Sequence, residues 1–373
     1  MGQEHSSFYS DSARSRLLNG PVVSVLLLNR PLFTVSPDAS LLEVLRIFRT
    51  KNISCVPIIQ PKNKKSSSSS DTVPPPSLLS IFDITAFIAT SYAQLGAASF
   101  TANLKSILKV SCLQLADFST HNSTHSITTR TSLLDAARTM DELRVSRLLL
   151  RHCENDNDDD DDADEDIHSG RLIGMVTQSN IVEAILLNLD ALHPHPDATL
   201  RDLKLYPTSP VVACLDSTPT IAVLQDMRTR GVTAVPVVSA TTGSMVGIMT
   251  VRHLKTLTII NNNNNNSNNN NNHSPTAKDK DTDTTSTMSG LFLPTGAFLK
   301  QVGATFVTAS RDTTTLRQLL RVVVVNTYHH IFFCDDAGRV EGVVALGDLI
   351  RWCVLGSRGR ANSITSNAAT IGA

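Results

Sequence analysis

The stretch Gly231–Val238, GVTAVPVV, is followed by the connection SATTGS and then by Met245–Thr250, MVGIMT. Two short runs of β-branched and apolar residues, separated by a connection with Gly and Ser, predict antiparallel strands joined as a hairpin. In front of them, Thr218 and Pro219 predict an N-cap and the first position of an amphipathic helix. Behind them, residues 253–260, HLKTLTII, predict a closing helix. With an apolar strand at its start, the segment predicts a unit of order β-α-β-β-α.

This unit recurs four times in the 373 residues. Its second strands are ISCVPII (53–59), VSRLLL (145–150), VTAVPVV (232–238) and HHIFFC (329–334). Its third strands are LLSIF, RLIGMVT, MVGIMT and VEGVVAL, and a closing helix follows each of them. Segments that repeat about 90 residues apart, once insertions are allowed for, indicate copies of one supersecondary unit. The predicted fold class is therefore α/β (α+β), with four β-α-β-β-α repeats.

Local signals place the helices within the repeats. Ser40-x-x-Glu43 is a capping box, in which the two side chains satisfy backbone N–H groups at a helix start. The helix after it, LLEVLRIFRT (41–50), carries apolar residues at helical spacing on one face, which predicts their burial: Leu41, Val44, Leu45 and Phe48. Periodicity alone cannot assign the β-branched run Val322–Val325 to a helix or a strand. We interpret it as the end of the helix in the fourth repeat.

The domain boundaries follow from the repeats and from three low-complexity inserts. We predict a disordered N-terminus (1–20), repeat 1 (21–95), repeat 2 (105–192, with an acidic insert at 154–169), repeat 3 (199–260), an Asn-rich linker (261–289), repeat 4 (290–356) and a disordered tail (357–373). A further Ser- and Pro-rich insert, 61–77, falls between two strands of repeat 1. The inserts have too little apolar content to form a core, so we expect them to be disordered.

Composition limits the class of protein. Apolar residues make up 41% of the chain, and no uninterrupted apolar run approaches the ~18 residues of a membrane-spanning helix. The six cysteines lie far apart without a CxxC motif, and two of them fall in strand-like apolar runs, which is typical of reduced core residues. Together with the lack of a secretory leader, this usage favours a cytoplasmic or nuclear location.

Charge is unevenly distributed. Residues 154–166 hold ten of the 34 acidic residues and no basic one, so the rest of the chain is net basic. A basic body suits an anionic ligand, but scattered solvated Lys and Arg side chains are the favoured explanation of it. The acidic run lacks the Gly-bearing alternation of a calcium loop, so we interpret it as a solvated spacer.

The repeats, with their VPII and VPVV strands and a hydroxyl-x-x-Asp pattern at the last helix, resemble cystathionine-β-synthase (CBS) domains, which pair into Bateman modules. The resemblance covers residues 21–356. Four repeats in one chain, with YHHIFFCDDAGRVEGVVALGDLI at 328–350, are most similar to the gamma regulatory subunit of AMP-activated protein kinase. This resemblance implies a non-catalytic regulatory subunit that binds AMP, ADP or ATP in clefts between paired repeats. It also implies a partner protein kinase with catalytic and beta-type subunits.

The resemblance also implies a ribose-binding aspartate at the start of the last helix of a repeat. Asp83, preceded by Ser80, and Asp348 match this position. A carboxylate accepts hydrogen bonds at two oxygens and so suits two vicinal hydroxyl donors. Repeats 2 and 3 carry Asn180 and His253 instead, so we expect at most two competent sites, one per module. The alternative for both aspartates is helix capping. The hydroxyl of Ser80, which repeat 4 lacks, favours the site in repeat 1.

Phosphate and base contacts are implied in the same way. Near the second strands lie Arg147, His329 and His330, which the resemblance assigns to phosphate. Arg presents a fixed fork of donors, whereas His is only partly cationic at neutral pH and would make binding pH-dependent. The alternative is that each is an ordinary surface or core residue. The resemblance also implies base contacts from the turns at the first strands. These contacts would come from Thr34 and Val35 in repeat 1 and from Thr308 and Ala309 in repeat 4.

Two other function classes remain open in the sequence. One is an interaction or scaffold protein whose nucleotide clefts have degenerated, as Asn180 and His253 suggest. The other is an enzyme, which is disfavoured because no P-loop, nucleophile elbow, HExxH or kinase signature occurs. We therefore predict no catalytic residue, no catalytic cofactor, no metal site and no nucleic-acid partner.

Two short motifs complete the sequence evidence. The N-terminus fits the M-G-x-x-x-[ST] pattern of myristoylation at Gly2, and a single acyl chain would give only reversible membrane contact. The HPHP segment at 193–196 brings two histidines close together without a Cys or an acid at ligand spacing. We interpret this segment as a linker between modules.

Overall fold

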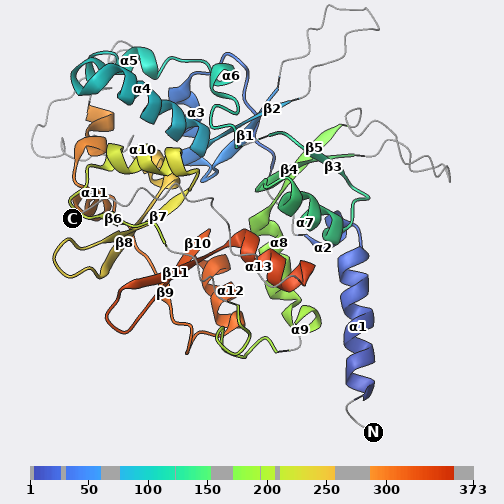
Figure 1. Ribbon diagram of the computed structural model, residues 1–373. Helices are drawn as coiled ribbons and strands as arrows, with labels where there is room; N and C mark the ends of the chain where they lie inside the picture. The colour runs from blue at the N-terminus through green and yellow to red at the C-terminus, as the bar shows by residue number, and fades with distance from the viewer. Residues whose placement is uncertain are drawn as a thin grey trace, which may run out of the picture. The chain divides into compact units, whose positions relative to one another are not determined.

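The computed structural model describes residues 4–26, 31–59, 76–121, 123–152, 171–193, 195–205, 211–256 and 286–356. Within these ranges the predicted fold class is confirmed, because four small units of helix, β-hairpin and helix follow one another (Figure 1). The acidic insert, Gly2, Cys153 and the C-terminal tail lie outside the described residues, as does most of the other two inserts. The ends of those two inserts are ordered where we predicted disorder, since β2 begins at Ser77 and a short helix, η3 (Ser286–Phe292), begins at Ser286.

Each repeat is built on a hairpin. The hairpins are β1 (Cys55–Ile58) with β2 (Ser77–Ser80), β4 (Arg147–Arg151) with β5 (Leu172–Thr177), β7 (Ala234–Val238) with β8 (Met245–Thr250), and β10 (His330–Cys334) with β11 (Val340–Ala345). In repeats 2 to 4 a short parallel strand joins the first hairpin strand: β3 (Ser126–Thr128), β6 (Cys214–Leu215) and β9 (Thr308–Ala309). In repeat 1, Val35 forms only an isolated parallel bridge to Ile58. The two predicted hairpin strands are therefore confirmed in all four copies, and the predicted opening strand in repeats 2 to 4.

The helices follow the predicted order. The first helices of the repeats are α3 (Leu41–Thr50), α7 (Leu133–Glu142), α10 (Thr220–Arg230) and α12 (Leu316–Val325). The closing helices are α4 (Ile81–Ala102), α8 (Gln178–Leu187), η1 (Val251–Thr256) and α13 (Leu346–Ile350), which continues as η4 (Arg351–Leu355). The apolar face predicted for α3 has no exposed surface at any of its four positions. Val322–Val325 ends α12, as we interpreted it.

The helix starts show which helix boundaries the local sequence can predict. The capping box of α3 is present, since Ser40 and Glu43 exchange hydrogen bonds in both directions. The start of α10 differs from the prediction by one residue, because Pro219 itself is the N-cap and the helix begins at Thr220. The hydroxyl of Thr220 donates to the carbonyl of Leu293 at 3.0 Å, so tertiary packing sets this helix start.

The chain forms two compact units. Unit 1 comprises Met1–Pro31, His125–Val211 and Val307–Ala373, and unit 2 comprises Leu32–Thr124 and Val212–Phe306. Unit 1 therefore holds repeats 2 and 4, and unit 2 holds repeats 1 and 3. Residues on both sides of the HPHP segment belong to unit 1, so this segment does not separate the two units.

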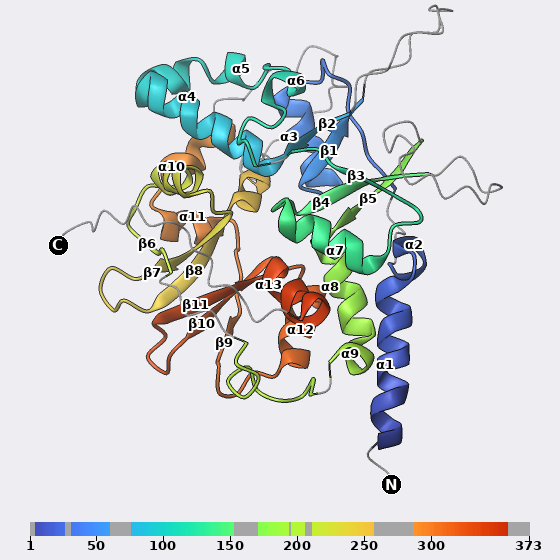
Figure 2. The same cartoon turned by 45° about the vertical axis from the view of Figure 1, so that its right-hand side comes forward.

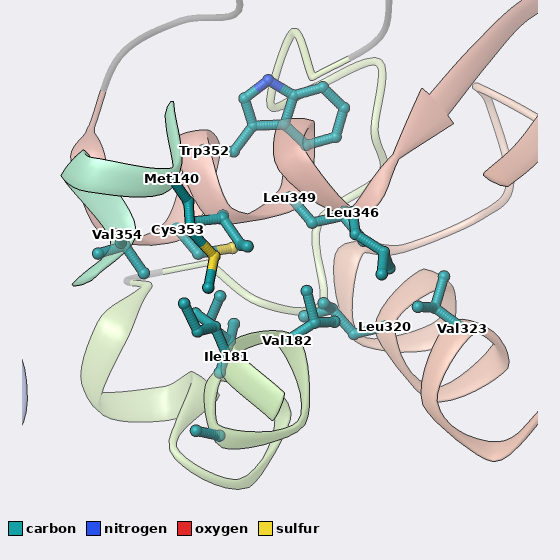
Figure 3. Close-up of a cluster of buried hydrophobic side chains, with 14 of the residues drawn as sticks. Met140, Ile181, Val182, Leu320, Val323, Leu346, Leu349, Trp352, Cys353 and Val354 are labelled. Atoms are coloured by element: carbon teal, nitrogen blue, oxygen red, sulfur yellow. The ribbon is translucent and has the colours of Figure 1, made fainter. Parts of the chain in front are cut away.

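Each unit has a hydrophobic core of its own. In unit 2, α4 lies beside α10 (Figure 1), and the largest buried side chains are aromatic: Phe48, Phe100 and Phe298. In unit 1, α8 packs against α12 and α13. Figure 3 shows Ile181 and Val182 of α8 among Leu320, Leu349 and other residues of repeat 4. In both units the core therefore joins two repeats that are not consecutive in the chain.

The segment in front of each repeat completes a neighbouring repeat. Four isolated antiparallel bridges join such a segment to the start of a first helix: Pro21 to Ser132, Ser111 to Ser40, Thr199 to Thr315 and Pro294 to Pro219. The short helices α2 (Val22–Val25), α6 (Cys112–Leu115) and α11 (Thr295–Gln301) follow three of these bridges. Repeats 1 and 2 thus exchange their leading segments, as do repeats 3 and 4. The sequence boundaries had left each leading segment with its own repeat.

The N-terminus is helical where the sequence analysis predicted disorder. Helix α1 (Glu4–Asn19) packs against α7 and α9 (Leu189–Leu192) in unit 1, and Figure 2 shows it alongside them. Leu18 is buried and Leu17 is partly buried against the same core. Because a short polar helix is marginal on its own in water, these two leucines supply the tertiary packing that stabilises it.

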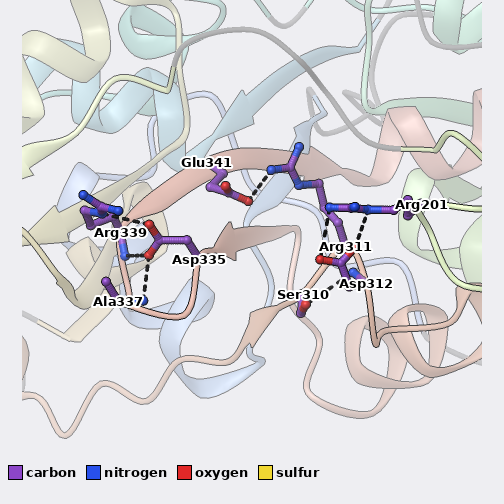
Figure 4. A network of polar contacts seen from close by, with 8 residues as sticks. All are labelled: Arg201, Ser310, Arg311, Asp312, Asp335, Ala337, Arg339 and Glu341. Carbon is purple, nitrogen blue, oxygen red and sulfur yellow. Dashed lines mark hydrogen bonds and ion pairs between the residues drawn. The ribbon is translucent and has the colours of Figure 1, made fainter.

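Ion pairs link the segment in front of repeat 3 to repeat 4. Arg201 pairs with Asp312, and Arg311 beside it donates to Glu341 at 2.6 Å (Figure 4). Arg317 donates to Asp197 at 2.8 Å and also contacts Asp190. Exposed ion pairs contribute little singly, about 0 to 1 kcal/mol, so we assign them to alignment of the segment more than to stability.

Two further predictions concern residue classes. None of the described helices has the length and apolar character that crossing a bilayer requires. Five cysteines fall within the described ranges, and none forms a disulfide there. Burial raises the pKa of Cys214 and of Cys353 to about 12, which is typical of thiols in a protein core.

Candidate functional site

The four closing helices begin with the same hydrogen bond. In each repeat the backbone N–H of the N-cap residue donates to the side chain three residues later: Ser80 to Asp83 Oδ2 (2.8 Å), Thr177 to Asn180 Oδ1 (3.0 Å), Thr250 to His253 Nδ1 (3.2 Å) and Ala345 to Asp348 Oδ2 (2.9 Å). The capping role that we weighed for the aspartates is therefore present in all four repeats. It uses one acceptor atom of each side chain, so each aspartate keeps its second oxygen for other donors.

Asp83 has no spare acceptor position. Oδ2 also accepts from the hydroxyl of Ser80 at 2.7 Å. Oδ1 accepts from the backbone N–H of Ser119 at 3.0 Å and from its hydroxyl at 2.6 Å. A carboxylate offers about four acceptor positions, and at least four donors reach this one. Its side chain has no exposed surface, so a ligand cannot contact it in this arrangement.

Asp348 is only partly used. Apart from the cap, its Oδ1 accepts from Arg351 at 2.8 Å, and Arg351 also donates to Asp141 of α7 at 2.8 Å. Within the described part of the chain these are its hydrogen bonds, so about two of its four acceptor positions remain. Its side chain is 19% exposed. Asp348 is therefore the more accessible of the two carboxylates. The Ser80 hydroxyl, which favoured Asp83 in the sequence, occupies one of the acceptor positions of Asp83.

The predicted phosphate residues lie at two equivalent strand starts in unit 1. Arg147 begins β4 opposite Thr177, the N-cap of α8, and His330 begins β10 opposite Ala345, the N-cap of α13. His329 precedes β10, and its backbone carbonyl accepts from Leu346 at 3.3 Å. Both strand starts therefore lie beside the start of a closing helix.

These two helix starts meet. The hydroxyl of Ser179 in α8 lies 3.4 Å from Nε2 of His329, and a Cβ added at Gly347 of α13 would lie 3.4 Å from Nε2 of Gln178. Helices α8 and α13 are in contact, His329 lies at their junction, and the strands that begin at Arg147 and His330 pair with the N-cap residues of these two helices. One guanidinium nitrogen of Arg147, Nη1, is buried and finds no hydrogen-bond partner among the described residues.

Two histidines, His330 at the start of β10 and His253 in the first turn of η1, are uncharged at neutral pH. Burial lowers the pKa of His330 to about 4, and burial with the nearby Arg252 lowers the pKa of His253 to about 4. His330 is therefore a neutral hydrogen-bonding group at pH 7 and not the partial cation that the sequence analysis expected. The neutral form of His253 also fits its geometry, because Nδ1 must carry a lone pair to accept from Thr250.

The predicted base contacts Thr34 and Val35 do not share a hollow with Asp83. Thr34 is exposed and lines an open hollow of about 440 Å³ in unit 2, together with Val35, Ser36, Ala39, Glu43, Arg46 and Ile47. Asp83 is not among the lining residues. Thr308 is exposed in β9, and Ala309 beside it is buried. The structure therefore groups the unit 1 residues more closely than those of unit 2.

A metal centre is not evident in the part of the chain that the structure describes, since it contains no group of three His, Cys, Asp or Glu side chains that could hold an ion. The residue that sequence reasoning missed is Ser119, which contacts Asp83 from a turn 36 positions away. No local sequence signal identifies such a contact.

Comparisons with known proteins agree with the fold. The CBS domain model matches residues 23–65, 200–257 and 302–355. Among solved structures, protein MJ1225 from Methanocaldococcus jannaschii, a proposed archaeal homologue of g-AMPK, is 14% identical over 89% of this chain and 99% of that one, with a TM-score of 0.58. Comparison with curated proteins gives no match.

Two further structures are more distant. An uncharacterized conserved protein from Pyrococcus horikoshii covers 90% of this chain and all of its own, at 13% identity and a TM-score of 0.47. CBSX2 in complex with AMP covers 45% of this chain and 97% of its own, at 20% identity and a TM-score of 0.30. The second repeat, which the family model does not match, has the same order of elements as the other three. The chain therefore carries CBS domains in three matched regions, within a fold of four repeats.

Proposed function

We propose that this protein is a non-catalytic regulatory subunit that binds an adenine nucleotide in unit 1 and modulates a partner protein kinase. The observation that carries the proposal is the junction of α8 with α13. There, a carboxylate with unused acceptor positions and a buried guanidinium nitrogen without a partner occur in one CBS core.

The first step concerns the ribose. Asp348 is fixed by its cap, which holds Oδ2 at the N–H of Ala345. The vicinal hydroxyls of a ribose are two donors, and the acceptor positions that remain on this carboxylate match them. Because hydrogen bonds to a charged acceptor are stronger than neutral ones, about 1.5 to 3 kcal/mol each, this contact contributes substantially to binding.

The second step concerns the phosphate. A buried donor without a partner costs about 1 to 3 kcal/mol, and an anion beside Nη1 of Arg147 would recover that free energy. Arg keeps its charge at every physiological pH and presents its N–H groups in a fork that suits phosphate oxygens. His330 is neutral and would add a hydrogen bond without charge. Phosphate binding through Arg147 should therefore vary little around pH 7.

The third step is regulation. A ligand at the junction of α8 with α13 contacts repeats 2 and 4 at once and favours the state in which both helix starts are ordered. A partner with different affinities for the two states responds to that shift. The sequence resemblance supports protein kinase catalytic and beta-type subunits as these partners, with AMP, ADP or ATP as the ligand.

The test is binding of AMP, ADP and ATP to the full chain, in wild type and in Asp348→Asn. Calorimetry and thermal shift measure the binding. Asn180 shows that an amide oxygen can keep the cap in this fold, so the substitution should remove the ribose contact without removing the helix start. We expect at least about tenfold weaker binding. Asp312→Asn, at an exposed ion pair of the same unit, is the matched control and should bind as wild type does.

An interaction or scaffold role is the second candidate, because Asp83 is fully engaged with groups of this chain. Absence of a thermal shift with any adenine nucleotide at millimolar concentration would favour it, since a ligand that binds only the folded state stabilises it by an amount that rises with the logarithm of its concentration over Kd. The kinase assignment has its own test. Purification from native material should recover kinase catalytic and beta-type subunits, and their consistent absence counts against it.

A further inference from the structure

We infer that Arg351 is a positioning residue, which links the Asp348 carboxylate to α7 of repeat 2, fixes its orientation, and so sets a preference for nucleotides that carry both ribose hydroxyls. The inference rests on the proposed function, in which Asp348 accepts from the ribose. It adds a residue that acts through Asp348 and not by its own contact with the ligand.

Arg351 lies where the closing helix of repeat 4 changes its geometry. Helix α13 ends one residue earlier, and Arg351 begins η4, a single π-helical turn. Such turns are rare and occur frequently at functional sites. The next three residues, Trp352, Cys353 and Val354, are buried. Helix α7 contacts η4, and Figure 3 shows Met140 of α7 in the same apolar cluster. The backbone at Arg351 is therefore fixed against α7 by apolar packing.

The guanidinium of Arg351 joins two carboxylates from different repeats. Its Nη1 donates to Oδ1 of Asp348 at 2.8 Å, and its Nε donates to Oδ1 of Asp141 in α7 at 2.8 Å. The side chain of Arg351 is only 18% exposed, so solvent screens these contacts less than it screens an exposed ion pair. A guanidinium presents its donors in a fixed fork, whereas a lysine ammonium has no such fork.

The consequence for Asp348 is a defined carboxylate plane. The terminal torsion of an aspartate side chain has a broad energy minimum, so one hydrogen bond leaves this plane poorly defined. In Asp348 each oxygen has its own donor, since the Ala345 N–H holds Oδ2 at 2.9 Å and Arg351 holds Oδ1. The remaining acceptor positions therefore point in set directions. Two vicinal hydroxyls, whose spacing is also fixed, gain most from an acceptor that is oriented in advance.

The four repeats differ at this position. Three residues after the capping side chain, repeat 4 has Arg351, whereas repeats 1, 2 and 3 have Ala86, Glu183 and Thr256. None of these three side chains is a cation, so none could hold a carboxylate in this way. The arginine therefore occurs in the repeat whose capping carboxylate keeps unused acceptor positions, which supports a role at that site.

The experiment compares AMP with deoxy-AMP, which lacks one of the two vicinal hydroxyls. Calorimetry measures the binding of both to the full chain in wild type, Arg351→Met, Arg351→Lys and Asp141→Asn, and the quantity compared is the ratio of the two Kd values. A loss of folded or binding-competent protein weakens both ligands by the same factor and leaves this ratio unchanged. The ratio therefore separates positioning from a purely structural role.

We expect wild type to prefer AMP by about tenfold, the effect of one hydrogen bond to a charged acceptor. In Arg351→Met this preference should fall to about threefold or less, because the Asp348 plane is no longer fixed. Arg351→Lys should fall between the two, since it keeps the charge without the fork. Asp141→Asn should also lower the preference, because Arg351 loses its charged partner on α7. Arg201→Met, at an exposed ion pair of the same unit, is the matched control and should not change the ratio.

A double variant checks that Arg351 acts through the carboxylate. In Asp348→Asn, adding Arg351→Met should not change the ratio further, and a further change would contradict the inference. An unchanged ratio in Asp141→Asn would overturn the link to α7.

The remaining outcomes separate this inference from the proposed function. If wild type prefers AMP and either Arg351→Met or Arg351→Lys keeps that preference in full, the positioning role is wrong and the proposed function stands. If wild type binds AMP and deoxy-AMP equally well, the ribose contact and the positioning role are both wrong. If wild type binds no adenine nucleotide, the proposed function fails and the positioning role fails with it.

Discussion

The substitution His253→Asn should make the stability of unit 2 less dependent on pH in the acidic range. In the folded chain, Nδ1 of His253 accepts from the Thr250 N–H at 3.2 Å, and its ring contacts Phe298 edge-on at 6.3 Å between centroids. Protonation would turn Nδ1 into a donor and place a charge in a desolvated position beside Arg252. Burial, and then the nearby Arg252, hold the pKa of His253 at about 4, against an ordinary value of 6.5.

The direction of the effect follows from proton binding. Between the two pKa values the unfolded chain binds a proton that the folded chain excludes, so stability is full above pH 6.5 and falls as the pH drops toward 4. For a shift of this size, lowering the pH from about 7.5 to about 5 should remove about 2 kcal/mol through His253 alone. Asn cannot be protonated in this range, and Asn180 shows that its amide oxygen can accept the same N-cap hydrogen bond.

The assay is hydrogen exchange with mass spectrometry in increasing urea, at both pH values, for wild type and His253→Asn. Peptides from α4 and α10 report unit 2, and Trp352, the single tryptophan, reports unit 1 by fluorescence. We expect the variant to lose about 2 kcal/mol less stability in unit 2 on acidification, with unit 1 unchanged. An identical loss in variant and wild type would refute the assignment of a neutral, buried histidine.

Two further predictions concern packing and charge. Phe48→Ala should cost unit 2 about 3 to 5 kcal/mol, because the side chain has no exposed surface, whereas Val325→Ala, at a position 78% exposed, should cost less than about 0.5 kcal/mol in the same urea assay. Arg351→Met should destabilise unit 1 by about 1 to 3 kcal/mol, since it leaves the carboxylates of Asp141 and Asp348 without their shared partner. Trp352 fluorescence during urea unfolding measures this change, and an unaltered midpoint would show that the pair is energetically neutral.

Local features of the fold could be predicted from the sequence. The buried face of α3, the Ser40 capping box and the helical end of α12 depend on residues a few positions apart, so periodicity and capping rules suffice. The hairpins of repeats 3 and 4 follow for the same reason, because their short connections leave antiparallel pairing as the available geometry.

Long-range features could not be predicted. The pairing of repeat 1 with repeat 3 depends on which helix faces are complementary, and the four repeats have similar patterns. Helix α1 was missed because its polar sequence gives no periodic signal, and Leu17 and Leu18 gain their role only against α7 and α9.

The candidate site shows the same limit. The sequence identifies Asp83 and Asp348 by position, but their accessibility depends on Ser119 and Arg351, and the Ser119 contact spans 36 positions. The charge of His330 likewise depends on burial that its sequence neighbours do not reveal.

The division of the chain between the units also bears on synthesis at the ribosome. The polypeptide crosses between them after residues 31, 124, 211 and 306, so a nascent chain that stops before repeat 3 contains half of each core and the whole of neither. Apolar faces such as those of α4 and α8 would then await partners that have not yet been translated. We expect production of this protein to depend on holding chaperones, and to respond to translation speed between residues 125 and 306, more than a chain of consecutive, self-contained domains would.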